Sequence, residues 1–427
     1  MKLYQIRMLL VVLTLFWSVL PAPAATLDDL VAEALAANPE VKASSARWEM
    51  FEQKARAAGT FDDPMIMLGI DSGLVRDPFN LDRDMQTAKV IGISQMVPFF
   101  GKRELARQAA GAEAEASRWE IEERKLELAA MVKESWYQLY FTDQSLVALE
   151  RSIANLDNLV RFVETMYGVG QARQADVLRV QVERSKMEEM RLVLTQQRRS
   201  LEAGLNSLLN RPTATAMPAI DNVELTPATL DAVELERLAE EKRPLLRALA
   251  SRIGKASAER ALADREFYPD FTLNFEYMQK NSIMDDDPGY DMYNASVSFN
   301  LPLQRERRHA MVAESEASRR MAEEELNMTR NRIRQTIADL LAQLERDRGM
   351  AVLYREGIIP QSASAVESAL SAYRAGKGEF MQVLDSRMSL LNFERDYYRA
   401  VAEHQMELAR LEATVGVVLD GQVTRDR

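Results

Sequence analysis

Apolar residues in the long polar-rich segments of the chain recur in steps of three and four. A strict seven-residue period predicts long helices that pack side by side along a supercoiled seam, rather than one helix face on a globular core. Three segments carry such a seam, at Leu149, Ile153, Leu156, Val160, Val163 and Tyr167, at Ile359, Ala363, Val366, Leu370 and Tyr373, and at Val180, Met187, Leu194, Leu201 and Leu208.

Two other segments alternate apolar with polar residues. From Phe271 to Tyr277 every second residue is apolar, and residues 291–301 alternate in the same way with Asn and Ser between them. This pattern predicts strands with one apolar and one polar face. Strands of about 9 to 11 residues suit a tilted crossing of a bilayer, with lipid on one face and a wet lumen on the other. A soluble hairpin packed on helices would show the same alternation.

The sequence contains one structural unit twice. Tyr167 recurs as Tyr373, and the pair Asn38-Pro39 recurs as Arg243-Pro244, at offsets of 206 and 205 residues. Each copy has the order helix, strand, strand, long helix, helix, which predicts a mainly α fold with a small β part. The predicted elements are 27–59, 64–71, 88–97, 99–167 and 174–210 in the first copy, and 228–266, 270–279, 291–301, 303–374 and 379–418 in the second.

The ends of the copies give the predicted organisation of the chain. The ranges are a signal peptide at 1–24, a first repeat at 25–212 with its hairpin at 99–210, a linker at 213–227, a second repeat at 228–418 with its hairpin at 303–418, and a tail at 419–427. The acidic, glycine-containing loops between the paired strands, including Asp285 to Gly289, are expected at the outer surface.

The first residues predict export from the cytoplasm. Lys2 and Arg7 precede a 13-residue apolar run, Met8 to Leu20, and Ala22-Pro23-Ala24 is a typical cleavage sequence. The run is short against the roughly 20 residues that span a membrane, which disfavours an N-terminal anchor. No later stretch is apolar and long enough for a membrane helix, which excludes an inner-membrane transporter. The net charge of −11 disfavours nucleic-acid binding, and the absence of cysteine excludes disulfides, thiolate metal sites and lipidation through cysteine.

Four strands are too few to close a barrel, because the smallest transmembrane barrels have about eight. Open strand edges in lipid would leave backbone groups unsatisfied. Closure must therefore come from further copies, and three chains would supply twelve strands and twelve helices. Two or four copies would also close in principle, so the strand count leaves the number open.

The whole pattern resembles the TolC-like outer-membrane efflux family. The likeness lies in the duplicated order of elements, in the two segments that begin at Tyr167 and Tyr373, and in the strand-to-helix junction Gln95–Arg103, which is similar to that of heavy-metal efflux members. The resemblance implies a homotrimer with a 12-stranded outer-membrane β-barrel, continued by a periplasmic α-helical coiled-coil barrel. It also implies contact with outer-membrane lipid, a periplasmic adaptor protein and an inner-membrane pump that opens the helical tip.

The resemblance places a gate at the two helix tips. Tyr373 and Asp176 are implied to be constraining partners, and Asp385 an inner-ring carboxylate. Gln382 stands where relatives are often acidic, and Gly378 replaces a basic residue found in some of them. The remaining predicted gate residues are Tyr167 and Arg173, and the tip turns are assigned to Gly170, Gly376 and Gly378. Asp176 is equally well explained as a first-turn acid of the following helix.

No catalytic motif, cofactor site or metal site is assigned, so an enzyme is not expected. His404 falls in the seven-residue register of its helix and is expected to be a packed histidine, and the many acidic pairs read as solvated faces. Methionines in or beside the strands could bind Cu(I), or could be flexible filler facing lipid or packing seams: Met65, Met67, Met96, Met278, Met284 and Met292. The alternative functions are a periplasmic structural coiled-coil protein and an adaptor subunit without a pore.

Overall fold

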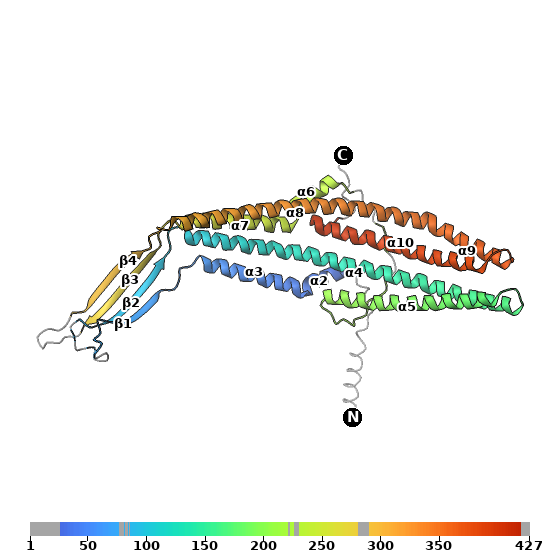
Figure 1. Ribbon diagram of the computed structural model, residues 1–427, viewed down its shortest axis with the longest axis horizontal. Helices are drawn as coiled ribbons and strands as arrows, with labels where there is room; N and C mark the ends of the chain where they lie inside the picture. Colours follow the sequence, from blue (N-terminus) through green and yellow to red (C-terminus); the bar gives the residue numbers. More distant parts are fainter. Residues whose placement is uncertain are drawn as a thin grey trace, which may run out of the picture. The chain divides into compact units, whose positions relative to one another are not determined.

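The computed structural model describes residues 26–76, 81, 84, 86–220, 223–225, 230–280 and 290–419 (Figure 1). The predicted signal peptide, the acidic turn Asp285 to Gly289, Met284 and most of the predicted tail lie outside these residues. The chain forms two compact units, each built from segments far apart in sequence. Of the described residues, the first unit holds those within 26–42, Glu123–Arg243 and 332–419, and the second holds those within Ala43–Glu122 and Pro244–Asn331.

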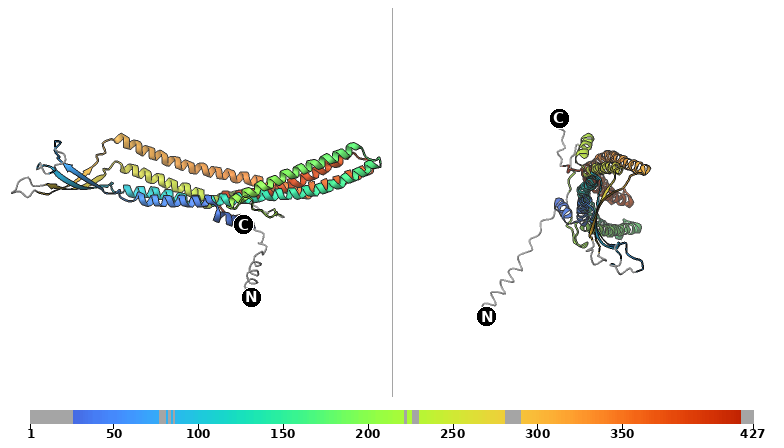
Figure 2. Two further views of the ribbon diagram at one scale, coloured as in Figure 1. Left: turned by 90° about the horizontal axis from the view of Figure 1, so that it is seen from below. Right: turned by 90° about the vertical axis from the view of Figure 1, so that its left-hand side faces the viewer.

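The second unit holds one antiparallel sheet in the order β1-β2-β3-β4 (Figure 2). Its strands are β1 (Met65–Asp71), β2 (Ala88–Val97), β3 (Phe271–Lys280) and β4 (Met292–Phe299). All four predicted strands are present, within two residues of the expected ends. The central pairing of β2 with β3 sets Val97 opposite Phe271, so the sheet is shared between the two halves of the chain.

The strand register sorts the sheet into two chemically different faces. One face is apolar along most of its length: Ile66, Leu68, Ile70, Lys89, Ile91, Ile93, Gln95, Val97, Phe271, Leu273, Phe275, Tyr277, Gln279, Tyr293, Ala295, Val297 and Phe299. The other carries small, polar and methionine residues: Met65, Met67, Gly69, Asp71, Ala88, Val90, Gly92, Ser94, Met96, Thr272, Asn274, Glu276, Met278, Lys280, Met292, Asn294, Ser296 and Ser298. The first face therefore suits lipid, whereas the second suits a wet surface.

Helices α3 (Pro39–Ala58) and α7 (Pro244–Arg265) accompany the sheet in this unit, together with the first parts of α4 (Lys102–Gly168) and α8 (Arg305–Leu353). Ion pairs join α7 to α4, including Lys255 Nζ to Glu113 Oε2 at 3.0 Å. The helices thus hold each other through charged side chains as well as through small apolar ones such as Ala109 and Ala256, which are buried.

The first unit is a bundle of long helices with two apolar cores. Besides the later parts of α4 and α8 it contains α2 (Leu27–Ala37), α5 (Gln174–Leu208), α6 (Ala232–Lys242), α9 (Ile359–Arg374) and α10 (Phe380–Val415). The predicted seam of α5 is confirmed, because Val180, Met187 and Leu194 are all buried. On α9 the buried stripe is Val366, Ala369 and Leu370, while Ala363 is exposed.

Three of the predicted helices are not continuous. The segments 27–59 and 228–266 each break before a proline, since Asn38 and Arg243 take extended ψ angles of 129° and 121°. Proline lacks an N–H donor and disfavours helical geometry in the residue before it. The segment 303–374 is interrupted by a π-helical turn, Tyr354–Ile358, just ahead of Pro360. A proline that cannot donate to the preceding turn is a recognised cause of such a bulge.

None of the helices in the described part of the chain has the length and hydrophobicity of a membrane span.

Candidate functional site

The two helix hairpins end in matching glycine turns. At the first tip Gly170 has a φ of +76°, its N–H donates to the carbonyl of Tyr167 at 3.0 Å, and Gln171 N–H donates to Met166 at 2.8 Å. At the second tip Gly376 has a φ of +71°, with the corresponding bonds to Tyr373 and from Lys377 to Ala372, both 2.9 Å. Both are the left-handed helix ending that favours glycine.

Gly378 is required for a different reason. A Cβ atom at this position would lie 3.1 Å from Ala372 Cβ and 3.2 Å from the backbone nitrogen of Tyr373. The bare backbone lets the chain turn back closely over the end of α9. This close approach accounts for a glycine at position 378 of this chain.

Asp176 acts as a helix-terminal acid. Its Oδ2 atom accepts a hydrogen bond from the backbone N–H of Arg173 at 3.3 Å, and its own N–H donates to the Arg173 carbonyl at 3.0 Å. Arg173 is the N-cap residue of α5, so the negative charge sits in the first turn, where the helix dipole favours it. The capping role considered from the sequence is confirmed. The side chain of Arg173 itself is exposed.

Tyr373 lies between the two hairpins of the first unit. Its ring contacts Phe162 of α4 at a centroid distance of 6.4 Å and Phe380 of α10 at 5.1 Å. Its hydroxyl is buried and has no hydrogen-bond partner among the described residues. Burial raises the pKa of Tyr373, and the nearby charge of Asp176 raises this pKa further. The structure thus brings Tyr373 and Asp176 close together, with no hydrogen bond between them. Tyr167 is about half exposed.

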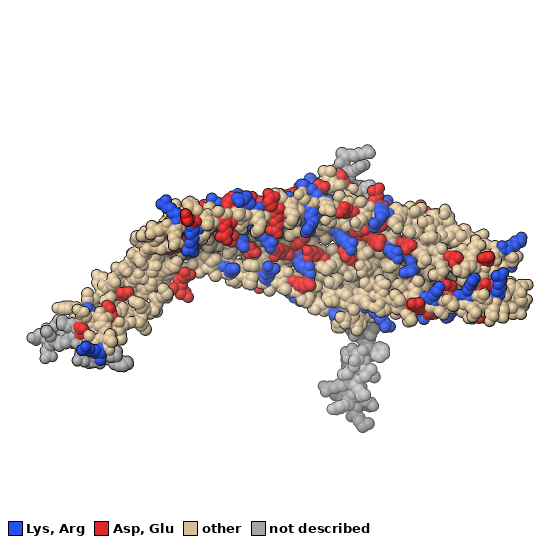
Figure 3. All heavy atoms as spheres, in the orientation of Figure 1, with Lys and Arg blue, Asp and Glu red and all other residues tan. Residues whose placement is uncertain are grey.

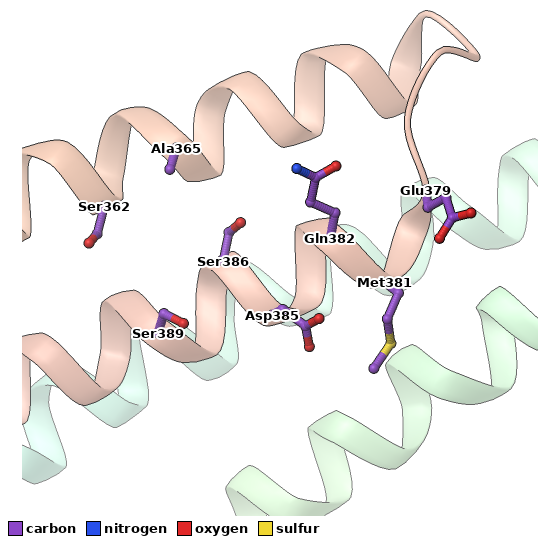
Figure 4. Close-up of a pocket in the computed structure, with 8 residues that line it drawn as sticks. All are labelled: Ser362, Ala365, Glu379, Met381, Gln382, Asp385, Ser386 and Ser389. Atoms are coloured by element: carbon purple, nitrogen blue, oxygen red, sulfur yellow. The ribbon is translucent and has the colours of Figure 1, made fainter.

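A groove of about 560 Å³ lies between α9 and α10 beside the second tip (Figure 4). In this view Gln382 and Ser386 point toward α9, whereas Met381 and Asp385 point away from it. The groove is lined by Ser362, Ala365, Glu379, Met381, Gln382, Asp385, Ser386 and Ser389. Its small hydroxyl side chains and two carboxylates make a polar surface, consistent with the aqueous position expected for Gln382 and Asp385.

The apolar core beneath the tips joins the two hairpins. Val163 and Val180 from the first hairpin belong to the same buried cluster as Phe380 and Val383 from the second. The two tips are therefore held as one four-helix group within a single chain. A change in their separation would have to break apolar contacts as well as polar ones.

A buried lysine fixes the junction between sheet and helices. Lys102, only 6% exposed, places Nζ 2.9 Å from Asp270 Oδ2 and 3.1 Å from Glu266 Oε1. Asp270 also accepts the backbone N–H of Phe99 at 2.8 Å. Gly101, with a φ of +89°, lets the chain turn into α4 at this point. The sequence motif Gln95–Arg103 contained this residue, but nothing in it indicated which acids would pair with Lys102.

Two helical acidic residues, of the kind expected from the sequence on solvated faces, are buried. Asp347 is 1% and Glu407 5% exposed. Arg346 holds Asp347 through two bonds of 2.7 and 2.8 Å. The sequence could have indicated the burial of Asp347, because this residue follows the spacing of three and four residues that joins the buried Leu344 and Ala351 of α8. His404 is 3% exposed, and its Nδ1 lies 3.2 Å from the Leu344 carbonyl, which confirms the expected packed histidine.

The electrostatics of the sheet differ from those of the helices. On the face shown in Figure 3, blue and red side chains crowd the helices and are sparse over the strands. Within β1–β4 the charged residues are Asp71, Lys89, Glu276 and Lys280. A sheet with so few charges and so many exposed apolar side chains suits a membrane environment.

Comparison with solved structures identifies the fold as that of a TolC-like channel. The outer membrane protein VceC from Vibrio cholerae superimposes with a TM-score of 0.76 at 20% identity, covering 92% of this chain and 97% of that one. The MtrE outer membrane channel of Neisseria gonorrhoeae, in its open state, gives a TM-score of 0.75 at 17% identity, covering 94% and 91%.

The sequence itself identifies the family. The chain belongs to the outer membrane efflux protein family, whose model matches residues 30–211 and 235–417. It is similar to the pyoverdine export outer membrane protein OpmQ of Pseudomonas putida, at 24% identity over 421 residues that cover 94% of this chain and 86% of that protein. OpmQ of Pseudomonas aeruginosa is also 24% identical, over 418 residues, covering 94% and 85%.

The protein is therefore an outer-membrane channel of an efflux system, which extends into the periplasm. The family is one of transport channels rather than of enzymes. This assignment replaces the structural coiled-coil protein and the poreless adaptor as explanations of the long helices.

Proposed function

We propose that three copies of the chain join through their sheet edges into a 12-stranded barrel, which is continued by a barrel of helices. The observation that supports this proposal is the sheet itself. Strands β1 and β4 are its two edges, and every residue of both strands is exposed. Unpaired strand edges in lipid cost several kcal/mol for each unsatisfied backbone group. Pairing β4 of one copy with β1 of the next removes both edges.

The direction of the strands fits this closure. Each strand is antiparallel to its neighbour, so β1 and β4 run in opposite directions. Under rotational symmetry β4 of one copy would therefore meet β1 of the next in an antiparallel pair. Three is the number that the family resemblance implies, and the apolar face would turn toward lipid while the polar face lines the lumen.

We also propose that the halves 25–212 and 228–418 are structural repeats joined by the linker 213–227, which gives the trimer pseudo-six-fold symmetry. Corresponding contacts support this reading. Asn38 Nδ2 donates to the Leu208 carbonyl at 2.9 Å, and Arg243 Nη1 donates to the Thr414 carbonyl at 3.2 Å. Both contacts tie a pre-proline residue to the end of the returning helix, at sequence offsets of 205 and 206.

The helix tips are proposed to form the periplasmic gate. Tyr167, Arg173, Asp176, Tyr373, Gln382 and Asp385 would hold it closed, around the turns at Gly170, Gly376 and Gly378. The nearness of Tyr373 to Asp176 and the polar groove at Gln382 support this assignment. A periplasmic adaptor and an inner-membrane pump would open the gate and supply the energy. The relatives' names make pyoverdine the first cargo to test.

The barrel is tested by substitutions on opposite sheet faces. Leu273→Arg places a charge on the apolar face, and Ser296→Arg places the same charge on the polar face. An arginine facing lipid near the bilayer centre costs about 2 to 4 kcal/mol. L273R should therefore sharply reduce the yield of heat-modifiable trimer in outer-membrane fractions, whereas S296R should leave it near the unsubstituted level. A water-soluble monomer, or equal yields for the two variants, would overturn the proposal.

A further inference from the structure

The end of the sheet that adjoins the helices carries a cluster of arginines. Arg305, Arg307 and Arg308 lie in the first turn of α8, shortly after β4 ends. Arg265 is the last residue of α7, shortly before β3 begins. Figure 3 shows blue side chains at the end of the helices that adjoins the strands. Because the sheet crosses the outer membrane in the proposed barrel, this cluster lies at the periplasmic surface of the bilayer.

Printed side-chain contacts hold the two groups of arginines at one junction. Arg308 Nε donates to the carbonyl of Glu266 at 2.5 Å, which joins the start of α8 to the end of α7. The guanidinium of Arg265 lies 5.8 Å from the ring centroid of Tyr268, and this ring stacks on Phe99 at 4.5 Å. The arginines of both helices therefore share a surface with aromatic rings.

These arginines are not neutralised by acidic side chains. Other arginines of the same two helices are paired, since Arg260 and Arg319 reach Glu316 at 3.0 and 2.8 Å. The first turn of a helix favours acidic residues, yet in α8 three arginines outnumber the single acid Glu306. Helix stability therefore gives no reason for this charge. Among the residues that the structure describes, no ion pair is formed by Arg265, Arg305, Arg307 or Arg308.

Exposed apolar side chains lie beside the arginines in sequence. Leu301 and Leu303 are 65% and 79% exposed, and Phe100 at the start of α4 is 80% exposed. Leu301 follows Phe299 by two residues, which continues the spacing of the apolar face of the sheet. Aromatic rings at such a level are typical of the boundary between lipid and water. The apolar part of this surface is thus continuous with the face that meets lipid.

The chemistry of the surface favours an anionic amphiphile. The planar guanidinium group matches the geometry of a phosphate and can donate two hydrogen bonds to it. Near an anionic membrane surface each arginine strengthens association about fivefold. A free phosphate would use the arginines alone, whereas a phospholipid also covers the exposed leucines. A lipid whose headgroup carries its own cation would leave the positive charge of the cluster uncompensated.

We propose that Arg265, Arg305 and Arg307 form a surface that binds the headgroups of anionic phospholipids in the periplasmic leaflet of the outer membrane. Leu301 and Leu303 contact the part of the acyl chains nearest the headgroup. The proposal rests on the barrel of the proposed function, whose apolar face meets lipid. It adds to that function the class of lipid that the junction selects.

The test uses the full mature protein reconstituted in phosphatidylcholine vesicles. A trace of phosphatidylglycerol or of phosphatidylcholine carries a spin label on its acyl chain, and electron paramagnetic resonance separates lipid held at the protein from fluid lipid. The unsubstituted protein should hold phosphatidylglycerol at least about fivefold more tightly than phosphatidylcholine. The double variant Arg305→Gln with Arg307→Gln should bring the two lipids close to equal binding.

The matched control is Arg332→Gln with Arg348→Gln, which removes the same charge from two exposed arginines further along α8. This variant should keep the preference for phosphatidylglycerol. The headgroup surface is overturned if the unsubstituted protein holds both lipids equally, or if the two double variants lose the preference to the same extent.

Two salts distinguish a lipid headgroup from a free anion. Sodium phosphate and sodium chloride at equal ionic strength should lower the preference equally, because both screen charge. If phosphate removes the preference and chloride does not, the cluster binds the free anion, and the assignment to lipid is overturned.

The phosphatidylcholine signal separates this failure from failure of the barrel. A barrel whose apolar face meets lipid holds part of the phosphatidylcholine. If that lipid is held and phosphatidylglycerol is not preferred, the barrel stands and only the arginine surface is wrong. If neither lipid is held, the sheet does not meet lipid, and both proposals are wrong.

Discussion

The carboxyl groups of Asp347 and Glu407 lie beside each other in a buried site where α8 packs against α10. Two carboxylates in such a site cannot both be charged without a large cost, so one proton is shared between them. Burial raises the pKa of Glu407 to about 8, and the neighbouring carboxyl group of Asp347 adds to the effect. The side chain of Arg346 opposes the shift from 3.5 Å.

This pair predicts a pH dependence of stability. The pKa of Glu407 is higher in the folded chain than the ordinary value of 4.5. Between these two pH values the folded state holds a proton that the unfolded state releases, so stability is full below about pH 4.5 and falls as pH rises through about 8. Glu407→Gln keeps this position neutral. It should flatten the decline of melting temperature between pH 5 and 9 and raise the melting temperature at pH 9.

The other charged groups that act on this site are Glu403 and Arg410 of α10 and Arg346 of α8, and the glutamine variant retains all of them. Glu356→Gln, at a side chain 64% exposed, is the matched control and should keep the unsubstituted pH profile. Parallel profiles for E407Q and the unsubstituted protein would contradict the shared proton.

The buried ion pair at the sheet junction predicts a large loss of stability. Lys102→Met leaves Asp270 and Glu266 without their cation. Breaking a fully buried pair costs about 3 to 5 kcal/mol, and the partial exposure of Glu266 lowers the expected loss to about 2 to 3 kcal/mol. Thermal unfolding of the purified protein in detergent, followed by circular dichroism, measures this loss.

The control for this prediction is Lys186→Met, which removes an exposed partner of Glu183. Exposed pairs contribute about 0 to 1 kcal/mol, so its melting temperature should stay close to that of the unsubstituted protein. Equal melting temperatures for K102M and K186M would show that the junction does not depend on the lysine charge.

The proposed gate predicts a change in conductance. Tyr373→Phe together with Asp176→Asn preserves the aromatic packing and the capping oxygen while it removes the hydroxyl and the charge. In the proposed closed trimer these two groups would bond to side chains of a neighbouring helix pair, and loss of about 1 kcal/mol of such interaction would raise a small open population about fivefold. Single-channel recordings in planar bilayers should show a higher mean conductance for this variant.

Tyr354→Phe, in the π-helical turn, changes a tyrosine outside the tips and serves as the control for the recordings. Its conductance should equal that of the unsubstituted channel. If the double variant at Tyr373 and Asp176 also conducts like the unsubstituted channel, these two residues do not hold the gate closed.

The features that the sequence predicted correctly are those set by the local conformational preferences of a few residues. The alternation around Phe275 located the strands because side chains of a strand point to opposite faces in turn. The glycines at 170 and 376 located the tips because left-handed backbone favours glycine. Pro39 and Pro244 fell inside segments predicted as continuous helices, whereas the structure breaks the helix before each of them. The π-helical turn ahead of Pro360 was not predicted either.

By itself the sequence determined the element order, the duplication, the apolar and polar sides of the second pair of strands, and the family resemblance, because each depends on residues close together along the chain or on direct comparison of segments. Only the tertiary structure decided which distant side chains meet. Lys102 with Asp270, and Asp347 with Glu407, are two such pairs, and no pattern in the sequence indicated either of them. Such contacts depend on strand register and helix packing. Both result from many weak interactions, so the residue type at a single position does not reveal them.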